Sequence, residues 1–379
     1  MNKIRLGISL SVALIIATLL LTIDLSCTKK SSKEVRLGAI LPLTGVAADI
    51  GRWAKEGIDL AVREINGTEV NSKLRIQVFY ENSKLDPREG LTSFQKVVDL
   101  HKVVAVITSG SGIVLSIAPE AERLHVVQMN YSAVDPQISR AGDYTFSLVN
   151  NSDIETEAMT RFVLDSLGFK EMAILYANTS YGVGTRDAMV HNFEAGGGKI
   201  IGTEAYAENV VDVKPVLIKL KSLRPPAVYL PGTIKDASTI LKQSMEVGFK
   251  TQWLSYNAIE GPQIIEIAGN AAEGLIYTSS NLYDLRLTEA EVEKFYDKYK
   301  QTYNAEPTIY AATAYDAVML IAEAAGRVEG TGEHVKDYLH KVKDYRGASG
   351  TISFDSTGSV RKPVFFKVVR NRRFLVYSR

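Results

Sequence analysis

The residues best placed to bind a small molecule form a short turn, Ser109–Gly112, at the end of an apolar run. This run, Val103–Thr108 (VVAVIT), is typical of a buried parallel strand, and a helix is expected to follow the turn. The hydroxyls of Ser109 and Ser111 and the backbone N–H groups beside Gly110 could bind a carboxylate, because a helix N-terminus carries a partial positive charge. The alternative is that one serine only caps the helix.

Other strand ends carry polar or aromatic side chains that could contact the same ligand. The loop Asn130–Pro136 (NYSAVDP) follows a predicted strand, and Ser132 or Tyr131 could reach the ligand from it, although Asp-Pro is also a turn signal. Tyr181 follows another strand and could cover a ligand by stacking or through its hydroxyl, or it could be a surface tyrosine. Trp53, near the start of the first helix, could line the cleft or pack inside the domain.

Motifs for catalysis or metal binding are missing from the sequence. It contains no G-x-S-x-G elbow, no P-loop and no H-E-x-x-H. Gly196–Lys199 (GGGK) lacks the Ser or Thr that follows in a P-loop and precedes a strand, so we interpret it as a turn. The five histidines show no metal-ligand spacing, and the single cysteine, Cys27, excludes a cysteine-based zinc cluster. We therefore expect a protein that is not an enzyme, with no metal and no cofactor.

Strands and helices alternate along the chain in two series of similar rhythm. The first series is predicted from apolar runs and helical spacing at Val35–Pro42, Gly45–Ile65, Leu74–Tyr80, Pro87–Asp99, Val103–Thr108 and Val126–Met129. The second series begins near residue 144 and includes Ile154–Leu167, Glu171–Tyr176, Thr185–Glu194, Lys199–Tyr206, Val213–Leu223, Pro226–Leu230, Ala237–Val247 and Gln252–Ser255. This alternation predicts an α/β fold with doubly wound, parallel sheets, in which ligands bind beyond the carboxyl ends of the strands.

The composition is that of a folded protein with no charge excess. The chain has 379 residues, of which 46% are hydrophobic, with 44 Lys+Arg against 43 Asp+Glu. The hydrophobic content excludes a disordered chain. The near-zero net charge argues against nucleic acid as a partner, because proteins that bind it usually carry a basic surplus. The length suggests two domains.

The N-terminus has the pattern of a targeting segment. Lys3 and Arg5 precede an uncharged, strongly apolar stretch, Leu6–Ile23. This order is typical of a secretory signal peptide, although the stretch is also near the lower length limit of a membrane-spanning helix. Either interpretation exports the rest of the chain to the bacterial cell envelope.

The single cysteine stands where a bacterial lipoprotein carries its lipid. The sequence before Cys27 resembles a lipobox, except that Asp24 replaces the usual leucine three positions before the cysteine. We predict a signal peptide at residues 1–26, lipidation of Cys27 and a polar tether at residues 27–34, so that a lipid anchor holds the protein to the membrane. The alternative is an uncleaved anchor with an incidental cysteine.

Several segments, in their order and spacing, resemble type I periplasmic binding proteins, and within them the leucine/isoleucine/valine-binding proteins of branched-chain amino-acid ABC transporters. The opening LGAILPLTGVAADIGRWAKEGIDLAVREING resembles the first strand, turn and helix of that family. Further segments that resemble it are Asn178–Gly182 (NTSYG), Phe193–Gly202 (FEAGGGKIIG), Gly248–Leu254 (GFKTQWL), Ala272–Tyr277 (AEGLIY) and Pro307–Ala317 (PTIYAATAYDA). The resemblance covers roughly residues 35–370.

The resemblance implies an architecture of the Venus-flytrap kind. Two Rossmann-like lobes are joined by three crossover strands, the ligand lies in the cleft between them, and hinge closure traps it. On this basis we expect an N-terminal lobe at residues 35–149 plus 281–347, and a C-terminal lobe at residues 150–280 plus 348–379.

The resemblance also implies roles for individual residues. Proteins of this family hold the ligand carboxylate at the turn that matches Ser109–Gly112. In the next loop Asn130 replaces a serine, and Val134 replaces a threonine that contacts both ends of an α-amino acid. Asn257 stands where the family has the carboxylate for the ligand ammonium, and Glu260 could substitute for it, since only a carboxylate forms the ion pair. Lesser candidates are Tyr206, Asp236, Asn281 and Tyr283.

The function implied is that of a lipid-anchored solute-binding protein, which captures a small ligand and presents it to the transmembrane subunits of an ABC permease. The departures from the family pattern at Val134 and Asn257 leave amides, aromatic carboxylates and other small organic acids as alternatives to an amino acid. A ligand-sensing receptor of the same fold is a second class, and an envelope enzyme on a flavodoxin-like scaffold is a third. We expect no nucleic-acid partner in any of these classes.

Overall fold

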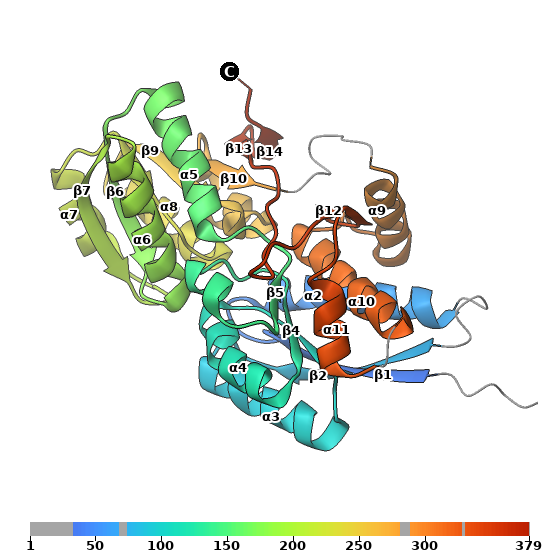
Figure 1. Cartoon of the computed structure of the whole chain (residues 1–379). Coiled ribbons are helices and arrows are strands. Elements are labelled where there is room, and N and C mark those ends of the chain that lie inside the picture. The colour runs from blue at the N-terminus through green and yellow to red at the C-terminus, as the bar shows by residue number, and fades with distance from the viewer. Residues whose placement is uncertain (1–32, 68–73, 281–288, 328–329, 379) are drawn as a thin grey trace, which may run out of the picture.

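The computed structural model describes residues 33–67, 74–280, 289–327 and 330–378 (Figure 1). The predicted signal peptide, Cys27 and the candidates Asn281 and Tyr283 lie outside the described residues. Across the described ranges, no helix has the length and apolarity needed to cross a membrane.

The first sheet has five parallel strands in the order β2-β1-β3-β4-β5. These strands are β1 (Lys33–Leu41), β2 (Leu74–Asn82), β3 (Ala105–Thr108), β4 (Val127–Asn130) and β5 (Thr145–Ser147). The helices between them are α2 (Ala48–Gly67), α3 (Pro87–His101), α4 (Ser111–Leu124) and the short turn η2 (Pro136–Arg140). Strands β3 and β4 are buried along their whole length, as expected for parallel strands covered on both faces.

The second sheet has seven strands in the order β14-β13-β10-β9-β8-β6-β7. Its strands are β6 (Glu171–Ala177), β7 (Lys199–Tyr206), β8 (Ala227–Tyr229), β9 (Gln252–Tyr256), β10 (Ile276–Ser279), β13 (Phe365–Arg370) and β14 (Arg373–Val376). All neighbours pair in parallel except β10 with β13 and β13 with β14. Its helices and turns are α5 (Ser152–Arg161), η3 (Phe162–Leu167), α6 (Ser180–Ala195), α7 (Lys214–Ser222), α8 (Ile234–Glu246), η4 (Asn257–Ile259), η5 (Ile264–Ala268) and η6 (Gly269–Ala272).

After the second sheet the chain returns to the first one. The returning elements are α9 (Ala290–Tyr303), α10 (Ile309–Arg327), α11 (Gly332–Leu339) and the hairpin β11 (Tyr345–Gly347) with β12 (Gly350–Ile352). Helix α10 is alanine-rich and buried on nearly every side, and it packs against α2. The two helices approach closely at Gly57, where a Cβ atom would lie 2.0 Å from the carbonyl oxygen of Ala311. Only glycine permits this contact.

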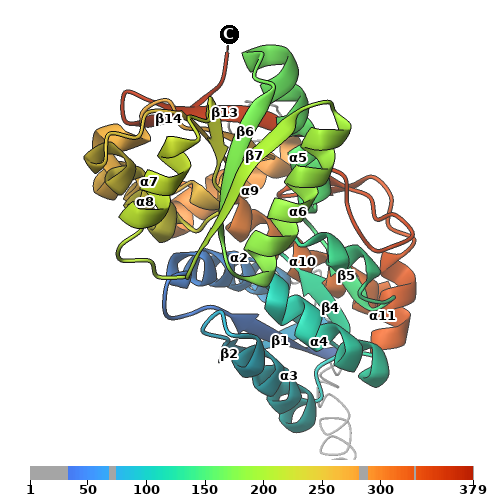
Figure 2. The same cartoon turned by 90° about the vertical axis from the view of Figure 1, so that its left-hand side faces the viewer.

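The two sheets and their helices form a first lobe and a second lobe, which lie one above the other in Figure 2. The chain passes between them after β5, after β10 and before β13. The predicted α/β fold with two mostly parallel sheets is confirmed. Residues as late as Ser359 still contact the first sheet, because Ser147 of β5 donates its N–H to the carbonyl of Gly358 at 2.8 Å. The residue boundaries of the two lobes stay a prediction.

Two elements differ from the expectation. Helix α6 begins at Ser180 rather than Thr185, because Thr179 caps it by accepting a hydrogen bond from the N–H of Gly182 at 3.2 Å. Gly182 also allows the helix start to touch the end of β6, since a Cβ there would lie 2.0 Å from the carbonyl oxygen of Ala177. Helix α11 was not expected from the sequence.

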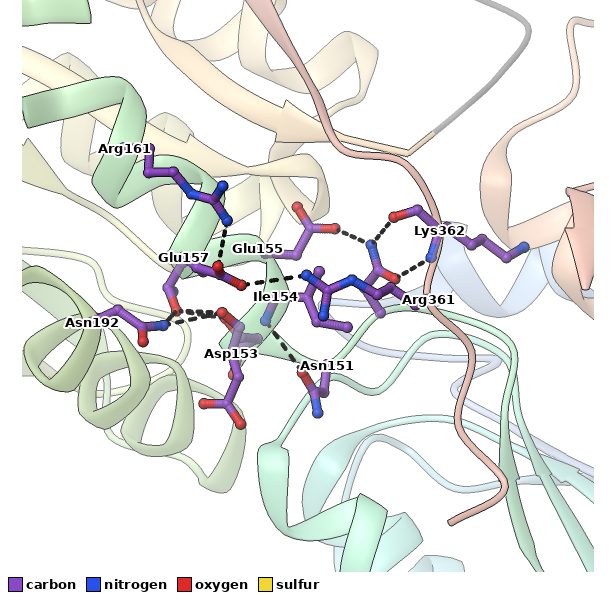
Figure 3. Close-up of polar contacts among 12 residues, drawn as sticks. Asn151, Asp153, Ile154, Glu155, Glu157, Arg161, Asn192, Arg361 and Lys362 are labelled. Atoms are coloured by element: carbon purple, nitrogen blue, oxygen red, sulfur yellow. Dashed lines mark hydrogen bonds and ion pairs between the residues drawn. The ribbon is translucent and has the colours of Figure 1, made fainter. Parts of the chain in front are cut away.

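Asn150 connects two of the passages between the lobes. Its amide nitrogen donates to the carbonyl of Lys362 at 3.0 Å and to Glu155 Oε1 at 3.1 Å, and its side-chain oxygen accepts the N–H of Lys362 at 2.7 Å. Figure 3 shows this chain of contacts between Glu155 and Lys362, with Arg361 reaching Glu157 beside it. The two passages are therefore held together by one buried side chain, and this junction between the lobes is called the hinge segment below.

The side chain of Lys362 continues from the hinge into the first lobe. Its Nζ donates to the carbonyl oxygen of Ser349 at 3.0 Å and to the Ser349 hydroxyl at 2.6 Å. Asp316, on α10, accepts hydrogen bonds from the N–H groups of Ala348 and Ser349 at 2.7 and 2.8 Å and from the Ser349 hydroxyl. Both charged side chains are almost fully buried. Lys362 and Asp316 are thus a buried pair of opposite charge linked through Ser349.

The burial of Lys362 makes the stability of the protein depend on pH. Burial lowers the pKa of Lys362 to about 8, although the charges of Asp316 and Glu289 oppose the shift. Between about pH 8 and about pH 10.4 the unfolded state binds more protons than the folded state, so stability rises with pH in this window. Relative to Lys362→Met, the wild-type protein should gain as much as about 3 kcal/mol over that range. Urea unfolding at pH 7.5 and pH 10 measures the gain, and a constant difference between the two proteins would contradict it.

Candidate ligand-binding site

A pocket of about 400 Å³ lies between the two lobes and takes its lining from both. The apolar lining comes from the first lobe, at Pro42, Ala47, Ile50, Leu85, Pro87 and Ile113. The second lobe contributes mainly polar and aromatic residues, at Asn178, Thr179, Ser180, Tyr181, Glu208, Thr233 and Tyr256. Figure 2 shows α6 of the second lobe above α4 of the first, and these two helices are in contact.

The turn after β3 has the geometry of an anion-binding site. Gly110 is the N-cap residue of α4, with φ 87° and ψ 116°, and no side chain caps the helix. Its carbonyl accepts the N–H groups of Ile113 and Val114 at 2.9 Å, so the N–H groups of Ser111 and Gly112 remain at the helix start beside the pocket. The alternative role, in which a serine caps the helix, is not what the structure shows. Ser109, Gly110 and Ser111 all line the pocket, and their contact with a ligand stays a prediction.

The register of β3 and β4 brings a second polar loop to this turn. Thr108 pairs with Asn130, so both strands end at the same level. The hydroxyls of Ser109 and Ser132 consequently meet in a hydrogen bond, and both residues line the pocket. Ser132 thus lies in the lining, and its contact with a ligand stays a prediction. Val134, which replaces the family's threonine, lines the pocket as well and gives it an apolar surface there.

Asn130 and Tyr131 support this loop from behind and do not line the pocket. The side-chain oxygen of Asn130 accepts the N–H groups of Ser132 and Ala133 at 3.1 and 2.7 Å, and its amide donates to the carbonyl of Ala133 at 2.7 Å. Tyr131 is fully buried, and burial raises its pKa. Asn130 therefore fixes the loop that carries Ser132.

Three tyrosines form the aromatic part of the lining. Tyr181 lies in the first turn of α6 and its ring centroid is 6.0 Å from that of Tyr256, while Tyr310 begins α10 on the first-lobe side. The hydroxyls of Tyr181 and Tyr310 are buried and have no hydrogen-bond partner among the described residues. Trp53 is 8% exposed and lies one layer behind the lining, stacked parallel on Tyr310 at a centroid distance of 6.0 Å.

The two residues considered for the ligand ammonium lie outside the lining. Ala258 lines the pocket between them, whereas Asn257 and Glu260 do not. Glu260 accepts a hydrogen bond from the buried ammonium of Lys367, so its charge is already compensated. The side-chain oxygen of Asn257 is buried and makes no hydrogen bond with any described residue.

Glu208 is the one charged side chain among the described residues of the lining. It was not singled out from the sequence, and neither were Tyr256, Thr233 and Tyr310. The rule that ligands bind beyond the carboxyl ends of strands could have found Glu208 and Tyr256, since they stand just after β7 and at the end of β9. Elsewhere in the described part of the chain, no three His, Cys, Asp or Glu side chains gather in a way that could hold a metal ion.

Comparison with known proteins identifies the family. Residues 34–372 match the family model described as periplasmic binding protein. The chain belongs to the periplasmic binding protein family. This confirms the resemblance to type I periplasmic binding proteins of the Leu/Ile/Val-binding kind, and the family is one of binding proteins rather than enzymes.

Similar periplasmic binding proteins share the whole length of the lobes. Leu/Ile/Val-binding protein homolog 3 of Brucella melitensis is 23% identical over 88% of this chain and 90% of its own. A leucine-binding protein from Thermotoga maritima superposes with a TM-score of 0.83 at 26% identity, covering 91% of this chain and 98% of its own. The substrate-binding protein of a branched-chain amino acid transporter from Streptococcus pneumoniae, solved with isoleucine, gives 0.82 at 25% identity, covering 91% and 99%.

Proposed function

We propose that the protein is the extracytoplasmic solute-binding component of an ABC importer, anchored through a lipid on Cys27, and that its ligand is a small amino acid with an aliphatic side chain. The uncapped start of α4 inside the interlobe pocket is the observation that carries this proposal. Mass spectrometry of the N-terminus would test the lipid, since an unmodified Met1 would exclude it.

The first support is the match between the turn after β3 and a carboxylate. Free N–H groups at a helix start and two hydroxyls, from Ser109 and Ser132, converge on one side of the pocket. Such a group of donors stabilises a negative charge without a cationic side chain. An α-carboxylate is the part of an amino acid that every ligand of this class shares.

The second support is the apolar wall of the first lobe. Ile50, Leu85 and Ile113 lie next to the carboxylate site and would contact the side chain of the ligand. The volume, about 400 Å³, is in the range of small-molecule pockets. The related protein from Thermotoga maritima is described as a leucine-binding protein, and that from Streptococcus pneumoniae was solved with isoleucine; both amino acids have side chains of this type.

Binding would couple to transport through closure of the two lobes. Because the lining comes from both lobes, a ligand makes its full set of contacts only when they approach each other. The ligand therefore stabilises the closed arrangement by the difference between its contacts in the closed and open forms. The closed surface is what the permease would recognise, and the hinge at Asn150 and Lys362 is where the rotation would occur.

Aromatic carboxylates form a second candidate class. Tyr181, Tyr256 and Tyr310 line the pocket and could stack on a ring, and Val134 removes a hydroxyl from the carboxylate loop. Such a ligand would use the same α4 turn, but it would need no partner for an ammonium.

A ligand screen separates these classes. Thermal unfolding of the purified protein with leucine, isoleucine, valine, benzoate or 4-hydroxybenzoate, each at millimolar concentration, should show stabilisation by the aliphatic amino acids. A ligand present at 100 times its Kd stabilises the folded state by about 2.7 kcal/mol, which raises the Tm by several degrees. A rise in Tm with the aromatic acids alone would favour aromatic carboxylates over amino acids as the ligand class. No rise in Tm with any of these compounds would contradict both classes.

A further inference from the structure

We infer that Glu208 and Asp236 form an acid pair that binds the ammonium group of the ligand. This pair makes the protein select amino acids over carboxylic acids that have the same carbon skeleton but no amino group. The inference deepens the proposed function and rests on it. It assigns the role to the ends of β7 and β8, in place of Asn257 and Glu260 on the neighbouring loop.

The pocket is polarised from one lobe to the other. On the first-lobe side the donors at the α4 turn, with Ser109 and Ser132, favour negative charge. On the second-lobe side Glu208 lies in the lining, and none of the described lining residues is Lys, Arg or His. A molecule that carries an anionic and a cationic end complements this arrangement, whereas a simple carboxylate leaves Glu208 without a partner.

Asp236 lies directly behind the lining, next to Glu208. It stands in the first turn of α8, whose N-cap residue Thr233 lines the pocket, and it is 1% exposed. Neither carboxylate oxygen makes a hydrogen bond of normal geometry with a described residue. Burial raises the pKa of Asp236, and the nearby Thr233 hydroxyl and the backbone N–H groups of Val210 and Asn209 offset the cost of burial only in part.

The two carboxylates disfavour each other's charge. Burial raises the pKa of Glu208, and the charge of Asp236 raises it further. Lys235 is the cation that acts on Asp236, and its side chain is exposed on the same helix. An ammonium group beside the pair would relieve both the repulsion and the unmet hydrogen-bonding capacity, which is the condition for a strong charge-assisted contact.

A tyrosine hydroxyl completes this cluster. Tyr206 ends β7, is 4% exposed, and its hydroxyl has no hydrogen-bond partner among the described residues. The charges of Asp236 and Glu208 both act on it, so it lies beside the pair. Gly232 leaves room for it, since a Cβ there would lie 2.5 Å from the Tyr206 hydroxyl oxygen. The Tyr206 hydroxyl and the carboxylate of Asp236 thus lie beside Glu208, which is the member of this cluster that lines the pocket.

The neighbouring loop offers no equivalent group. Glu260 is bonded to Lys367, and Asn257 carries no charge. Neither of them lines the pocket, whereas Glu208 does. A negative charge opposite the α4 turn is therefore supplied by Glu208 with Asp236 behind it.

The test compares L-leucine with 4-methylpentanoate, which has the same carbon skeleton and carboxylate but no ammonium. Titration calorimetry on the purified protein should show that leucine binds at least about 100-fold more tightly than 4-methylpentanoate. The substitutions Glu208→Gln and Asp236→Asn should each lower the affinity for leucine by about 10- to 100-fold. The affinity for 4-methylpentanoate should stay within about threefold in both variants. Glu194→Gln, an exposed acid on α6 away from the pocket, is the matched control and should change neither affinity.

Each other outcome counts against the inference. An equal loss of affinity for leucine and 4-methylpentanoate would show that Glu208 and Asp236 only support the fold. An unchanged preference for leucine would show that its ammonium group binds elsewhere. In both cases the proposed function stands. If the wild-type protein binds neither compound, the proposed function fails together with the inference. Glu208 is exposed, so Glu208→Gln carries the test even if Asp236→Asn does not fold.

Discussion

Replacing Asp316 by alanine should lower the free energy of unfolding by about 3–5 kcal/mol, the cost of leaving a buried charge without its partner. Asp316 is fully buried on α10, accepts hydrogen bonds from Ala348 and Ser349, and its charge opposes that of Lys362. Its removal leaves the buried Lys362 with the oxygens of Ser349 as hydrogen-bond partners and the charge of Glu289 as the remaining opposite charge that acts on it. Urea unfolding at pH 7 measures the loss.

A double variant tests the cause. Lys362→Met in the Asp316→Ala background removes the unpaired charge and should recover part of the lost stability, because the two side chains are energetically coupled. Asp337→Ala is the matched control: this aspartate pairs with Lys336 at 3.0 Å on the surface of α11, where such pairs contribute little. Additive losses for the two substitutions would argue against electrostatic coupling between Asp316 and Lys362.

Replacing Gly110 by valine should weaken ligand binding by about 100-fold, or about 2.7 kcal/mol. Gly110 has φ 87°, which is strained for any residue with a Cβ by about 1–3 kcal/mol. A Cβ would also lie 3.0 Å from Leu85 Cδ1 and 3.1 Å from Ile113 Cδ1, both in the pocket wall. The chain should relieve this strain by moving the turn that carries Ser109 and Ser111. Calorimetric titration with leucine measures the loss.

Gly197 provides a control with the same backbone strain outside the pocket. It has φ 85° in the turn between α6 and β7, and a Cβ there would meet no atom within 4 Å. Gly197→Val should therefore reduce stability but leave the leucine affinity close to that of the wild type. If both variants lose affinity equally, the effect comes from general destabilisation and not from the α4 turn.

The sequence predicted the part of the site that depends on local structure. Ser109, Ser111, Ser132 and Tyr181 line the pocket, because each follows closely on a strand whose apolar run is visible in the sequence. Their contact with a ligand stays a prediction. The parallel register, with Thr108 opposite Asn130, then brings the two serine-bearing turns together. The alternation of strands and helices was enough to obtain the α/β fold for the same reason.

The sequence did not predict contacts that depend on tertiary packing. Tyr310 reaches the pocket only because α10 returns to pack on α2, and Trp53 is displaced from the lining because it stacks on that tyrosine. Glu260 is chemically suited to bind an ammonium, yet Lys367, more than one hundred residues later, already occupies it. Helix α6 starts at Ser180, earlier than the sequence predicts, since Gly182 lowers helix propensity but is needed for contact with β6.

The late return of α10 has a consequence for how the chain folds during synthesis. The first lobe receives its strands from residues 33–147, but α10, which packs on α2 and contacts β2 and β3, comes from residues 309–327. The second lobe is nearer to complete at residue 279, and it lacks only the edge strands β13 and β14. The amino-terminal half of the nascent chain therefore exposes the apolar face of α2 until most of the protein has been made, although the strands of the first sheet are translated first.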